Sequence, residues 1–200
     1  MNYVLVSRNK HKIQEILEIL PELKNQIKTL NDFPQIPEID ETGKTYEENA
    51  LLKAKTVCHL LSITTLSDDS GLEVEELDGG PGIYSSRFLG ENTSYKIKNE
   101  AIIKKLQDAP REKRKARFVC AAAAVFPNGK ILTARGEIHG YIADKIQGES
   151  GFGYDPIFFL PDYGKTMAEL SEKEKNRISH RALAFRKLFD NLQSSSYNGK

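Results

Sequence analysis

The nine residues 118–126 are all apolar, and a turn sequence follows them almost at once. An uninterrupted apolar run of this length is typical of a central strand that is buried on both faces. Asn128-Gly129 is a strong signal for a tight hairpin turn, so residues 130–139 are predicted to return as an antiparallel strand. These two segments therefore predict a sheet that contains at least one hairpin.

Helical and strand patterns flank this hairpin on both sides. Residues 45–61 begin with Thr45-Tyr46-Glu47-Glu48, a capping box that predicts the start of a helix. The last predicted helix carries apolar residues at helical spacing, namely Ala182, Phe185, Phe189 and Leu192. The other predicted elements are strands at 3–6, 27–33 and 63–66 and helices at 13–20 and 95–106. Strands mixed with helices predict an α/β fold on a mixed sheet.

The composition is that of one globular domain without an evident attraction to polyanions. The chain has 200 residues, of which 39% are hydrophobic and 28% charged. We expect one domain at 1–193 and a frayed tail at 194–200. The formal net charge of +1 argues against nucleic acid and membrane partners. The basic segment 111–117 is interpreted as a solvated loop, because it contains Glu112 and no aromatic residue.

The sequence also predicts a cytoplasmic protein. Its first six residues are too few for a signal-peptide core, and a basic segment follows them. No apolar run is long enough to span a bilayer. Cys58 and Cys120 lie far apart in apolar stretches, so we expect both to be buried, reduced thiols.

The first candidate site is Ser7-x-Asn9-x-x-Lys12, at a predicted junction between a strand and a helix. Phosphate binds readily at a helix N-terminus, because the backbone N–H groups there are unpaired and carry partial positive charge. Lys12 would add a full charge, and Ser7 and Asn9 offer side-chain hydrogen bonds. In the alternative interpretation, Asn9 only caps the helix and Lys12 is solvated.

The second candidate is Asp68-Asp69-Ser70-Gly71, after the predicted strand 63–66. Carboxylates at a strand end can hold Mg²⁺ and orient or deprotonate a water molecule, and Glu41 could complete such a site. The alternative is a polar turn. A nucleophile site of the haloacid-dehalogenase type needs two aspartates separated by one residue. Asp68 and Asp69 are adjacent, so their side chains would diverge on an extended backbone, and this interpretation is set aside.

Two further candidates lie in the last quarter of the chain. In Gly151-Phe152-Gly153-Tyr154-Asp155-Pro156, the glycines would let a flat ligand approach the backbone while Phe152 stacks on it. Alternatively, these aromatic residues fill the core. Lys175 and Ser179-His180-Arg181, at the start of the last helix, offer donors for phosphate or carbonyl oxygens. Their alternative is a solvated, charged helix start.

The order of these motifs closely resembles that of the inosine triphosphate pyrophosphatase family, also called XTP/dITP diphosphatases. The resemblance runs from Val4 to about Leu188. It includes the four candidates above and three other blocks, Glu41-Thr42-Gly43, Tyr46-x-x-Asn49-Ala50-x-x-Lys53-Ala54 and Gly79-Gly80-Pro81-Gly82-Ile83-Tyr84-Ser85-Ser86-Arg87. Arg8 and Ser150 depart from the family pattern, which often has a small or neutral residue at the first position and a glycine at the second.

The resemblance implies an elongated mixed sheet flanked by helices, with two lobes and the active site in the cleft between them. It also implies a magnesium-dependent homodimer that hydrolyses ITP, dITP and XTP to the monophosphate and pyrophosphate. Such an enzyme keeps these nonstandard purine nucleotides out of DNA and RNA. Water would attack the α-phosphorus without a covalent intermediate.

Residue roles carry over from the family to the matching positions. Asp69 resembles the catalytic acid/base and a metal ligand, with Glu41 and Asp68 supporting the metal. The residues that resemble phosphate contacts are Ser7, Arg8, Asn9, Lys10, His11, Lys12, Lys53 and Ser70. The residues that resemble nucleotide contacts, mostly around the base, are Phe152, Gly153, Tyr154, Asp155, Lys175, His180 and Arg181.

Two other functions remain open at this point. A related enzyme could act on modified pyrimidine nucleotides or dUTP. A nucleotide-sensing module could bind through the same groups without turnover, although the pair of aspartates favours hydrolysis because sensing needs no base.

Overall fold

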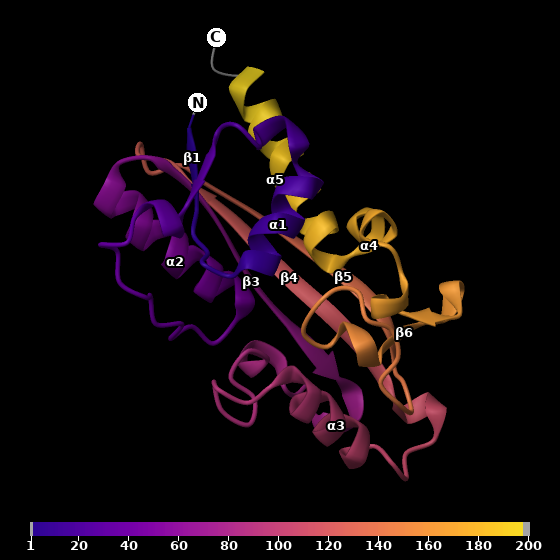
Figure 1. Cartoon of the computed structure of the whole chain (residues 1–200). Coiled ribbons are helices and arrows are strands. Elements are labelled where there is room, and N and C mark those ends of the chain that lie inside the picture. Colours follow the sequence, from indigo (N-terminus) through magenta and orange to yellow (C-terminus); the bar gives the residue numbers. More distant parts are fainter. Residues whose placement is uncertain (1, 198–200) are drawn as a thin grey trace. The chain divides into compact units, whose positions relative to one another are not determined.

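Seven strands form one sheet in the order β2-β1-β3-β4-β5-β6-β7 in the computed structural model, which describes residues 2–197 (Figure 1). The strands are β1 (Tyr3–Leu5), β2 (Ile27–Thr29), β3 (Thr64–Val74), β4 (Lys115–Val125), β5 (Ile131–Ile142), β6 (Phe158–Leu160) and β7 (Lys165–Thr166). The α-helices are α1 (Lys10–Ile19), α2 (Tyr46–Leu61), α3 (Tyr95–Lys105), α4 (Glu172–Ile178) and α5 (His180–Tyr197). Single 3-10 turns lie at Pro21–Leu23, Leu30–Asp32, Glu75–Leu77, Gly82–Tyr84, Arg111–Lys113, Asp155–Ile157, Pro161–Tyr163 and Met167–Glu169.

The sheet is mixed, as the sequence predicts. Strand β1 is parallel to β2 and to β3, with Tyr3 opposite Ile27 and Thr64. Strand β6 is antiparallel to both β5 and β7. The predicted hairpin joins β4 to its neighbour β5, and the Phe126 N–H donates to the Lys130 carbonyl at 2.9 Å. The α/β class is therefore confirmed.

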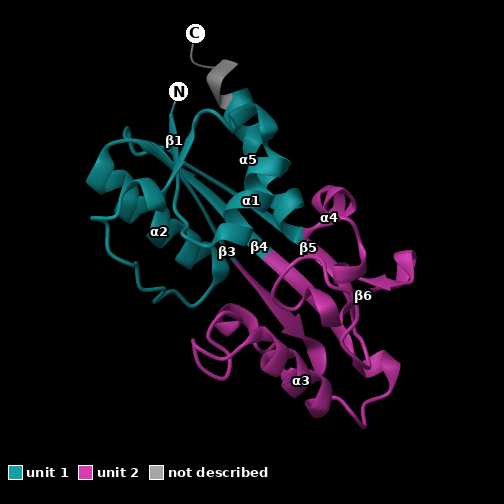
Figure 2. Cartoon of the chain, in the orientation of Figure 1, with its two compact units in different colours: residues 1–69, 120–136, 180–200 teal, residues 70–119, 137–179 magenta. Residues whose placement is uncertain are grey.

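The chain divides into two compact units (Figure 2). Unit 1 takes the residues up to 69, residues 120–136 and those from 180 onward, and unit 2 takes residues 70–119 and 137–179. Strands β3, β4 and β5 each pass from one unit into the other. The domain boundary at 193 and the cleft expected between two lobes stay predictions.

The core of unit 1 has two layers because side chains alternate along β1. Leu5 belongs to the cluster that contains Ile16 of α1 and Phe185 of α5, and these two helices lie side by side (Figure 1). Val4 belongs to a different cluster, which contains Val57 of α2. Helices α1 and α5 therefore cover one face of this part of the sheet and α2 covers the other.

Unit 2 has its own core around helix α3. Ile102 of α3 and Leu106, the C-cap of this helix, are fully buried in one cluster with Leu72 of β3 and with Phe118 and Phe158. The Phe118 and Phe158 rings lie 4.4 Å apart between centroids. This core holds the segment around residues 151–157, because Tyr154 and Ile157 belong to the same cluster.

The structure corrects two boundaries predicted from local sequence. Strand β3 does not end before Asp68 but continues through Asp68-Asp69-Ser70-Gly71 to Val74, so this segment is no turn. Turn propensity is overridden there because β3 belongs to the sheet, in which β4 is its neighbour, while β1 pairs with it only up to Leu66. Strand β4 likewise begins at Lys115, inside the segment 111–117 that was interpreted as a loop.

Four other elements differ from the expectations. Helix α4 and the short strands β6 and β7 have no counterpart among the predicted elements. Helix α5 continues to Tyr197, so the described part of the tail is helical, and residues 198–200 lie outside the described residues. Cys58 and Cys120 are buried free thiols, as predicted. In the described part of the chain, no helix is long and apolar enough to cross a membrane.

Candidate active site

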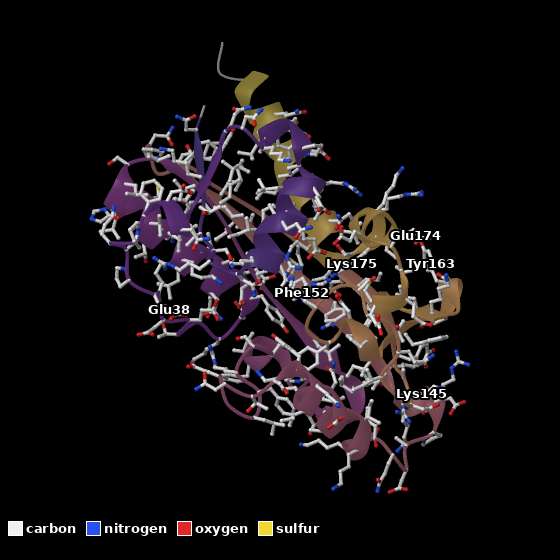
Figure 3. All side chains as sticks on the ribbon, viewed as in Figure 1. Glu38, Lys145, Phe152, Tyr163, Glu174 and Lys175 are labelled. Carbon is white, nitrogen blue, oxygen red and sulfur yellow. The ribbon has the colours of Figure 1, made fainter. Side chains whose placement is uncertain are left out.

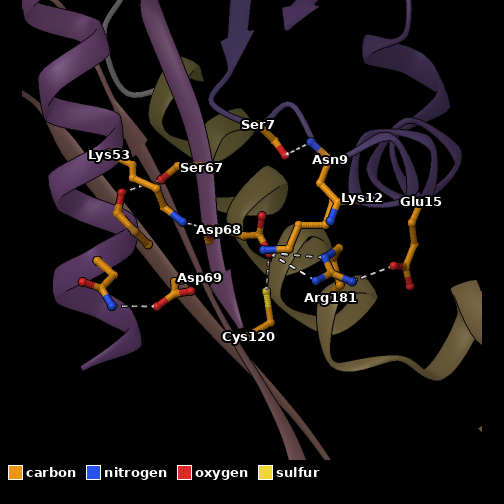
Figure 4. A network of polar contacts seen from close by, with 12 residues as sticks. Ser7, Asn9, Lys12, Glu15, Lys53, Ser67, Asp68, Asp69, Cys120 and Arg181 are labelled. Atoms are coloured by element: carbon orange, nitrogen blue, oxygen red, sulfur yellow. Dashed lines mark hydrogen bonds and ion pairs between the residues drawn. The ribbon is translucent and has the colours of Figure 1, made fainter. Parts of the chain in front are cut away.

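Strand β3 directs alternate side chains to the two helical layers of unit 1. Thr65 and Ser67 donate their hydroxyls to the carbonyls of Ala54 and Ala50 in α2, and Asp69 also faces α2. Asp68 faces the opposite layer, where it meets Lys12 of α1 and Arg181 of α5 (Figure 4). The period of two along a strand thus separates the two neighbouring aspartates.

The Ser7–Lys12 segment forms a capped helix start. Asn9 is the N-cap of α1, and its Oδ1 accepts from the N–H groups of His11 at 3.0 Å and Lys12 at 3.2 Å. Ser7 Oγ accepts from the Asn9 N–H at 3.2 Å. The capping interpretation of Asn9 is therefore confirmed, and phosphate binding by this segment remains a prediction. Arg8 donates to the Ile36 carbonyl at 2.7 Å, which ties this segment to the loop after β2.

Lys12 is not solvated but takes part in a buried charge cluster. Its Nζ lies 3.2 Å from Asp68 Oδ2, with 20% of the lysine side chain exposed. Arg181, which is 2% exposed, contacts Asp68 Oδ2 at 3.3 Å through Nη2 and Glu15 Oε2 at 2.6 Å through Nη1. Two cations and two carboxylates therefore balance each other, and of these four side chains only that of Lys12 is partly exposed.

The sequence interpretation missed Glu15, which is 6% exposed and anchors Arg181. A signal for it exists, because Glu15 lies one helical turn after Lys12 and beside the apolar position Ile16. An acidic residue on the buried side of an amphipathic helix needs a cationic partner. Cys120 was also missed as a neighbour of the cluster, with its Sγ 4.0 Å from Asp68 Oδ2.

The charges of this cluster shift the pKa values of its members. Burial by itself would raise the pKa of Asp68, but the charges of Lys12 and Arg181 outweigh burial and hold it well below its usual range. Burial would lower the pKa of Lys12, but the Asp68 charge raises it. Both groups consequently stay ionised at neutral pH.

Asp69 lies on the other face of β3, where its surroundings raise its pKa instead of lowering it. Its side chain is buried, and Oδ2 accepts from Asn49 Nδ2 at 2.9 Å. Burial raises the pKa of Asp69 and the Glu41 charge adds to this, while the Lys53 charge opposes them without cancelling them. Lys53 pairs with Glu41 and donates to the Asp68 backbone carbonyl at 2.8 Å. Asp69 is therefore a carboxylate with a raised proton affinity, which suits a general base.

The carboxylates of Asp69 and Glu41 are oxygen donors of the kind that Mg²⁺ prefers. Mg²⁺ is usually held by one or two carboxylates together with phosphate oxygens, rather than by a cage made only of protein. Burial raises the pKa of Asp69 and the Glu41 charge adds to this, and a cation beside the two carboxylates would stabilise their ionised forms. Among residues 2–197, no three or more His, Cys, Asp and Glu side chains are grouped to hold a metal ion by themselves. The Asp68 carboxylate forms ion pairs with Lys12 and Arg181.

The Gly151–Asp155 loop is ordered by its own aspartate. Asp155 Oδ2 accepts from the Phe152 N–H at 2.8 Å and from Lys175 Nζ at 2.7 Å. Lys175 Nζ also lies 4.6 Å from the centre of the Phe152 ring, and Figure 3 labels both side chains. This places a half-buried aromatic ring and a cation side by side, an arrangement that suits a flat, polar ring system.

Tyr154 differs from Phe152 in this loop. Its ring is buried and packs edge-on against Tyr95 at 5.3 Å, and its hydroxyl donates to the Ser85 carbonyl at 2.8 Å. For Tyr154 the structure therefore supports the core-filling alternative. The Gly153 carbonyl accepts from Asn99 Nδ2 at 3.1 Å, so α3 holds the middle of the loop.

The set Lys175, Ser179, His180 and Arg181 does not form a single group at the start of the last helix. Lys175 lies in α4, and Ser179 is the C-cap of that helix. Helix α5 begins at His180, so His180 and Arg181 belong to unit 1 whereas Lys175 belongs to unit 2. All three side chains are buried, which contradicts the alternative of a solvated helix start. Ser70, the first residue of unit 2, is half-buried in β3.

Comparison with known proteins agrees with these motifs. Residues 3–191 match the model of the Ham1 family. A dITP/XTP pyrophosphatase from Geobacter sulfurreducens is 47% identical over 189 residues, which cover 94% of this chain and 95% of that protein. The dITP/XTP pyrophosphatase from Bacillus cereus is 45% identical over 191 residues, which cover 94% of this chain and 93% of that protein.

Solved structures show the same fold. The Staphylococcus aureus Ham1 protein superposes with a TM-score of 0.86 at 39% identity, covering 97% of this chain and 100% of that one. A nucleoside-triphosphatase / dITP/XTP pyrophosphatase from Mycobacterium abscessus superposes with a TM-score of 0.76 at 35% identity, covering 96% of this chain and 99% of that one. The family that the motif order resembles is thus confirmed. The chain belongs to the Ham1 family.

Proposed function

We propose that this chain is a nucleoside-triphosphate pyrophosphatase that hydrolyses ITP, dITP and XTP to the monophosphate and pyrophosphate. The observation that carries the proposal is Asp69, a buried carboxylate of raised pKa beside Lys53 and Glu41. Relatives at 45–47% identity, named dITP/XTP pyrophosphatases, support the same substrates. Hydrolysis of these nucleotides would keep them out of DNA and RNA.

In the proposed reaction, Asp69 accepts the proton of a water molecule as the water attacks the α-phosphorus. A base whose pKa is raised toward the working pH is more effective, because it holds the abstracted proton better. Asn49 keeps the carboxylate in place by donating to Oδ2. The water oxygen ends in the monophosphate, and pyrophosphate leaves with the electrons of the broken P–O bond.

The cations of the site stabilise the charge that develops on the phosphates. Lys12 stays protonated because the Asp68 charge raises its pKa, and Lys53 is held near Asp69 by Glu41. Asp69 and Glu41 would hold Mg²⁺, and Asp68, which pairs with Lys12 and Arg181, would support the metal from the other side of β3. When bound, the ion neutralises charge on the phosphate oxygens.

The base is proposed to lie against Phe152, with donors directed at the carbonyl oxygen that ITP and XTP carry at position six. Lys175 and the backbone N–H groups of the 152–155 loop are the candidates in unit 2, while His180 and Arg181 of unit 1 are proposed as further nucleotide contacts. ATP presents an amino donor at this position, so a donor of the protein would face another donor. A buried group left unpaired costs about 1–3 kcal/mol, and two such mismatches correspond to about 10²-fold discrimination or more.

The finer assignments of partner and location rest on the family resemblance and on the sequence. We propose a homodimer that acts in the cytoplasm on free nucleotides and binds no nucleic acid. Sedimentation of the purified chain would report its oligomeric state.

A substrate panel tests the proposed function. ITP, dITP, XTP, GTP, ATP and dUTP are compared by kcat/KM at one Mg²⁺ concentration, with the products separated by chromatography. We expect ITP, dITP and XTP to be preferred over ATP by at least about 10²-fold, in line with the two mismatches. Equal efficiency for ATP and ITP would refute the base assignment, and a preference for dUTP would favour the pyrimidine alternative.

The bond that breaks is tested separately in ¹⁸O-labelled water. Attack at the α-phosphorus puts the label in the monophosphate and leaves pyrophosphate unlabelled. Release of inorganic phosphate and a diphosphate instead would show that the chain is not a pyrophosphatase.

A further inference from the structure

Asn49 links the two carboxylates of the proposed metal site. It lies in the first turn of α2 and is fully buried. Its Nδ2 donates to Asp69 Oδ2 at 2.9 Å, and its Oδ1 accepts from the Gly43 N–H at 2.7 Å. Gly43 follows Glu41 by two residues, so one buried amide joins Asp69 to the loop that carries Glu41.

The chemistry of the two partners allows only one orientation of this amide. The backbone N–H of Gly43 can only donate, so it must face the amide oxygen. The NH₂ group is thereby directed at Asp69, whose Oδ2 must accept. A carboxylate in place of the amide would face Asp69 with a second negative charge, and an apolar side chain would leave two polar groups unpaired.

Helix α2 holds the loop at two other points. Glu41 pairs with Lys53, and the Lys44 N–H donates to Glu48 Oε2 at 2.6 Å. The predicted capping box at Thr45 therefore forms only in part. Thr45 Oγ1 accepts from the Glu48 N–H at 3.1 Å, but the Glu48 carboxylate accepts from the Lys44 N–H instead of the Thr45 N–H. These contacts fix the loop to the helix, and the Asn49 amide adds a hydrogen-bonded connection from the loop to Asp69.

The close approach of the loop to Asn49 requires a glycine at position 43. A Cβ at position 43 would lie 2.6 Å from Asn49 Oδ1 and 2.7 Å from Glu48 Cβ, so a side chain there would push the loop off the helix. Atoms at these separations overlap, and the loop must move because Asn49 is closed in by the core.

We propose that Asn49 is the positioning residue of this site, which holds Asp69 and Glu41 at a fixed separation for one Mg²⁺ ion. The inference rests on the proposed function, since it takes both carboxylates as metal ligands. Asn49 does not touch the metal or the nucleotide. Asn49 holds the two carboxylates in place before the ion binds, so that Mg²⁺ binding costs less conformational entropy.

Two variants break the link from opposite ends. Asn49→Leu removes both hydrogen bonds, whereas Gly43→Ala leaves Asn49 and Asp69 intact and displaces the loop. The control is Thr56→Val, which removes a hydrogen bond from the Thr56 hydroxyl to the Leu52 carbonyl, 2.8 Å long, on the same helix. Circular dichroism melting curves identify any variant that does not fold.

The first readout is independent of turnover. Mg²⁺ alone is titrated into each full-length protein by calorimetry without nucleotide, and both variants are expected to bind it at least fivefold more weakly than wild type. The second readout is ITP hydrolysis at saturating Mg²⁺, where kcat should fall at least tenfold and KM for ITP should change less than twofold. The control should stay within twofold of wild type throughout.

The inference is overturned if either folded variant binds Mg²⁺ and turns over ITP as the control does. If Asn49→Leu does not fold, Gly43→Ala decides the question alone. A wild-type protein that binds Mg²⁺ but releases no pyrophosphate from ITP would reject the proposed function, while the calorimetry would still decide whether Asn49 positions the two carboxylates.

Discussion

Asp68 and Asp69 are neighbours in β3, yet their carboxylates belong to different layers of the protein. Asp68 Oδ2 lies 3.2 Å from Lys12 Nζ, whereas Asp69 Oδ2 accepts from Asn49 on the other side of the strand (Figure 4). Cations lower the pKa of Asp68, and burial with the Glu41 charge raises that of Asp69. One carboxylate is therefore a fixed charge, and the other is suited to accept a proton.

Replacement of the proposed base should separate activity from stability. We expect Asp69→Asn to lower kcat for ITP by at least about 10², the usual loss for a general base. Because the folded pKa of Asp69 is raised, the ionised carboxylate costs stability once the pH exceeds both the unfolded pKa, about 3.9, and the folded one. At pH 7 the variant should therefore melt at or above the wild-type temperature. Near wild-type turnover in a folded Asp69→Asn protein would exclude this role.

The Asp68 carboxylate should contribute stability with the opposite pH dependence. Its folded pKa is lowered, so this stability is fully present above the unfolded pKa of about 3.9 and is lost as the pH falls toward the folded pKa. Asp68→Asn should lower the free energy of unfolding by about 3–5 kcal/mol at pH 6, measured by urea denaturation, and by less below about pH 4.

The matched control for that experiment is Asp144→Asn. Asp144 pairs with Arg114 at 2.6 Å, but its side chain is 89% exposed, and exposed pairs contribute little. A loss as large in the control as in Asp68→Asn would show that burial of the charge cluster does not matter.

Glu41→Gln should affect the metal requirement more than the chemistry. The substitution keeps the shape of the side chain but removes the charge that acts on Asp69 and pairs with Lys53. We expect the Mg²⁺ concentration for half-maximal ITP hydrolysis to rise about tenfold, equivalent to about 1.4 kcal/mol. Glu38→Gln, at an exposed position of the same loop, serves as the control. An unchanged metal titration would remove Glu41 from the site.

Gly151→Ala should weaken nucleotide binding. Gly151 has φ of 75°, and a Cβ there would lie 2.2 Å from Asp155 Oδ2, the atom that orders the Phe152 loop. We expect KM for ITP to rise about tenfold, because left-handed strain and the collision each act on the loop. In Gly164→Ala, φ is 62° with no atom within 4 Å, so strain occurs without collision. Equal KM values for ITP in the two variants would show that the collision with Asp155 does not affect nucleotide binding.

Local sequence predicted the elements whose signals are carried by neighbouring residues. The apolar run 118–126 and Asn128-Gly129 predicted the β4–β5 hairpin, and Thr45 predicted the start of α2. Asn9 signalled the cap of α1. By contrast, Asp68-Asp69-Ser70-Gly71 resembles a turn locally, and only pairing with strands distant in sequence makes it part of β3.

The candidate site was predicted as a set of residues but not as an arrangement. Motif order alone identified the family and included Asp69, Lys53 and Glu41. The position of Glu15 indicated a need for a cationic partner, but not that this partner is Arg181, 166 residues away. Nothing in the sequence indicated that Asn49 bridges Gly43 and Asp69.

The sequence by itself determined the α/β class, the helix and hairpin starts, and the chemical groups available, because each depends on residues within a few positions of one another. The tertiary structure alone decided which carboxylate is neutralised and which keeps a raised pKa. The reason is physical: a pKa depends on burial and on charges within a few ångströms, and packing brings those charges from α1, α2 and α5 to the two faces of β3.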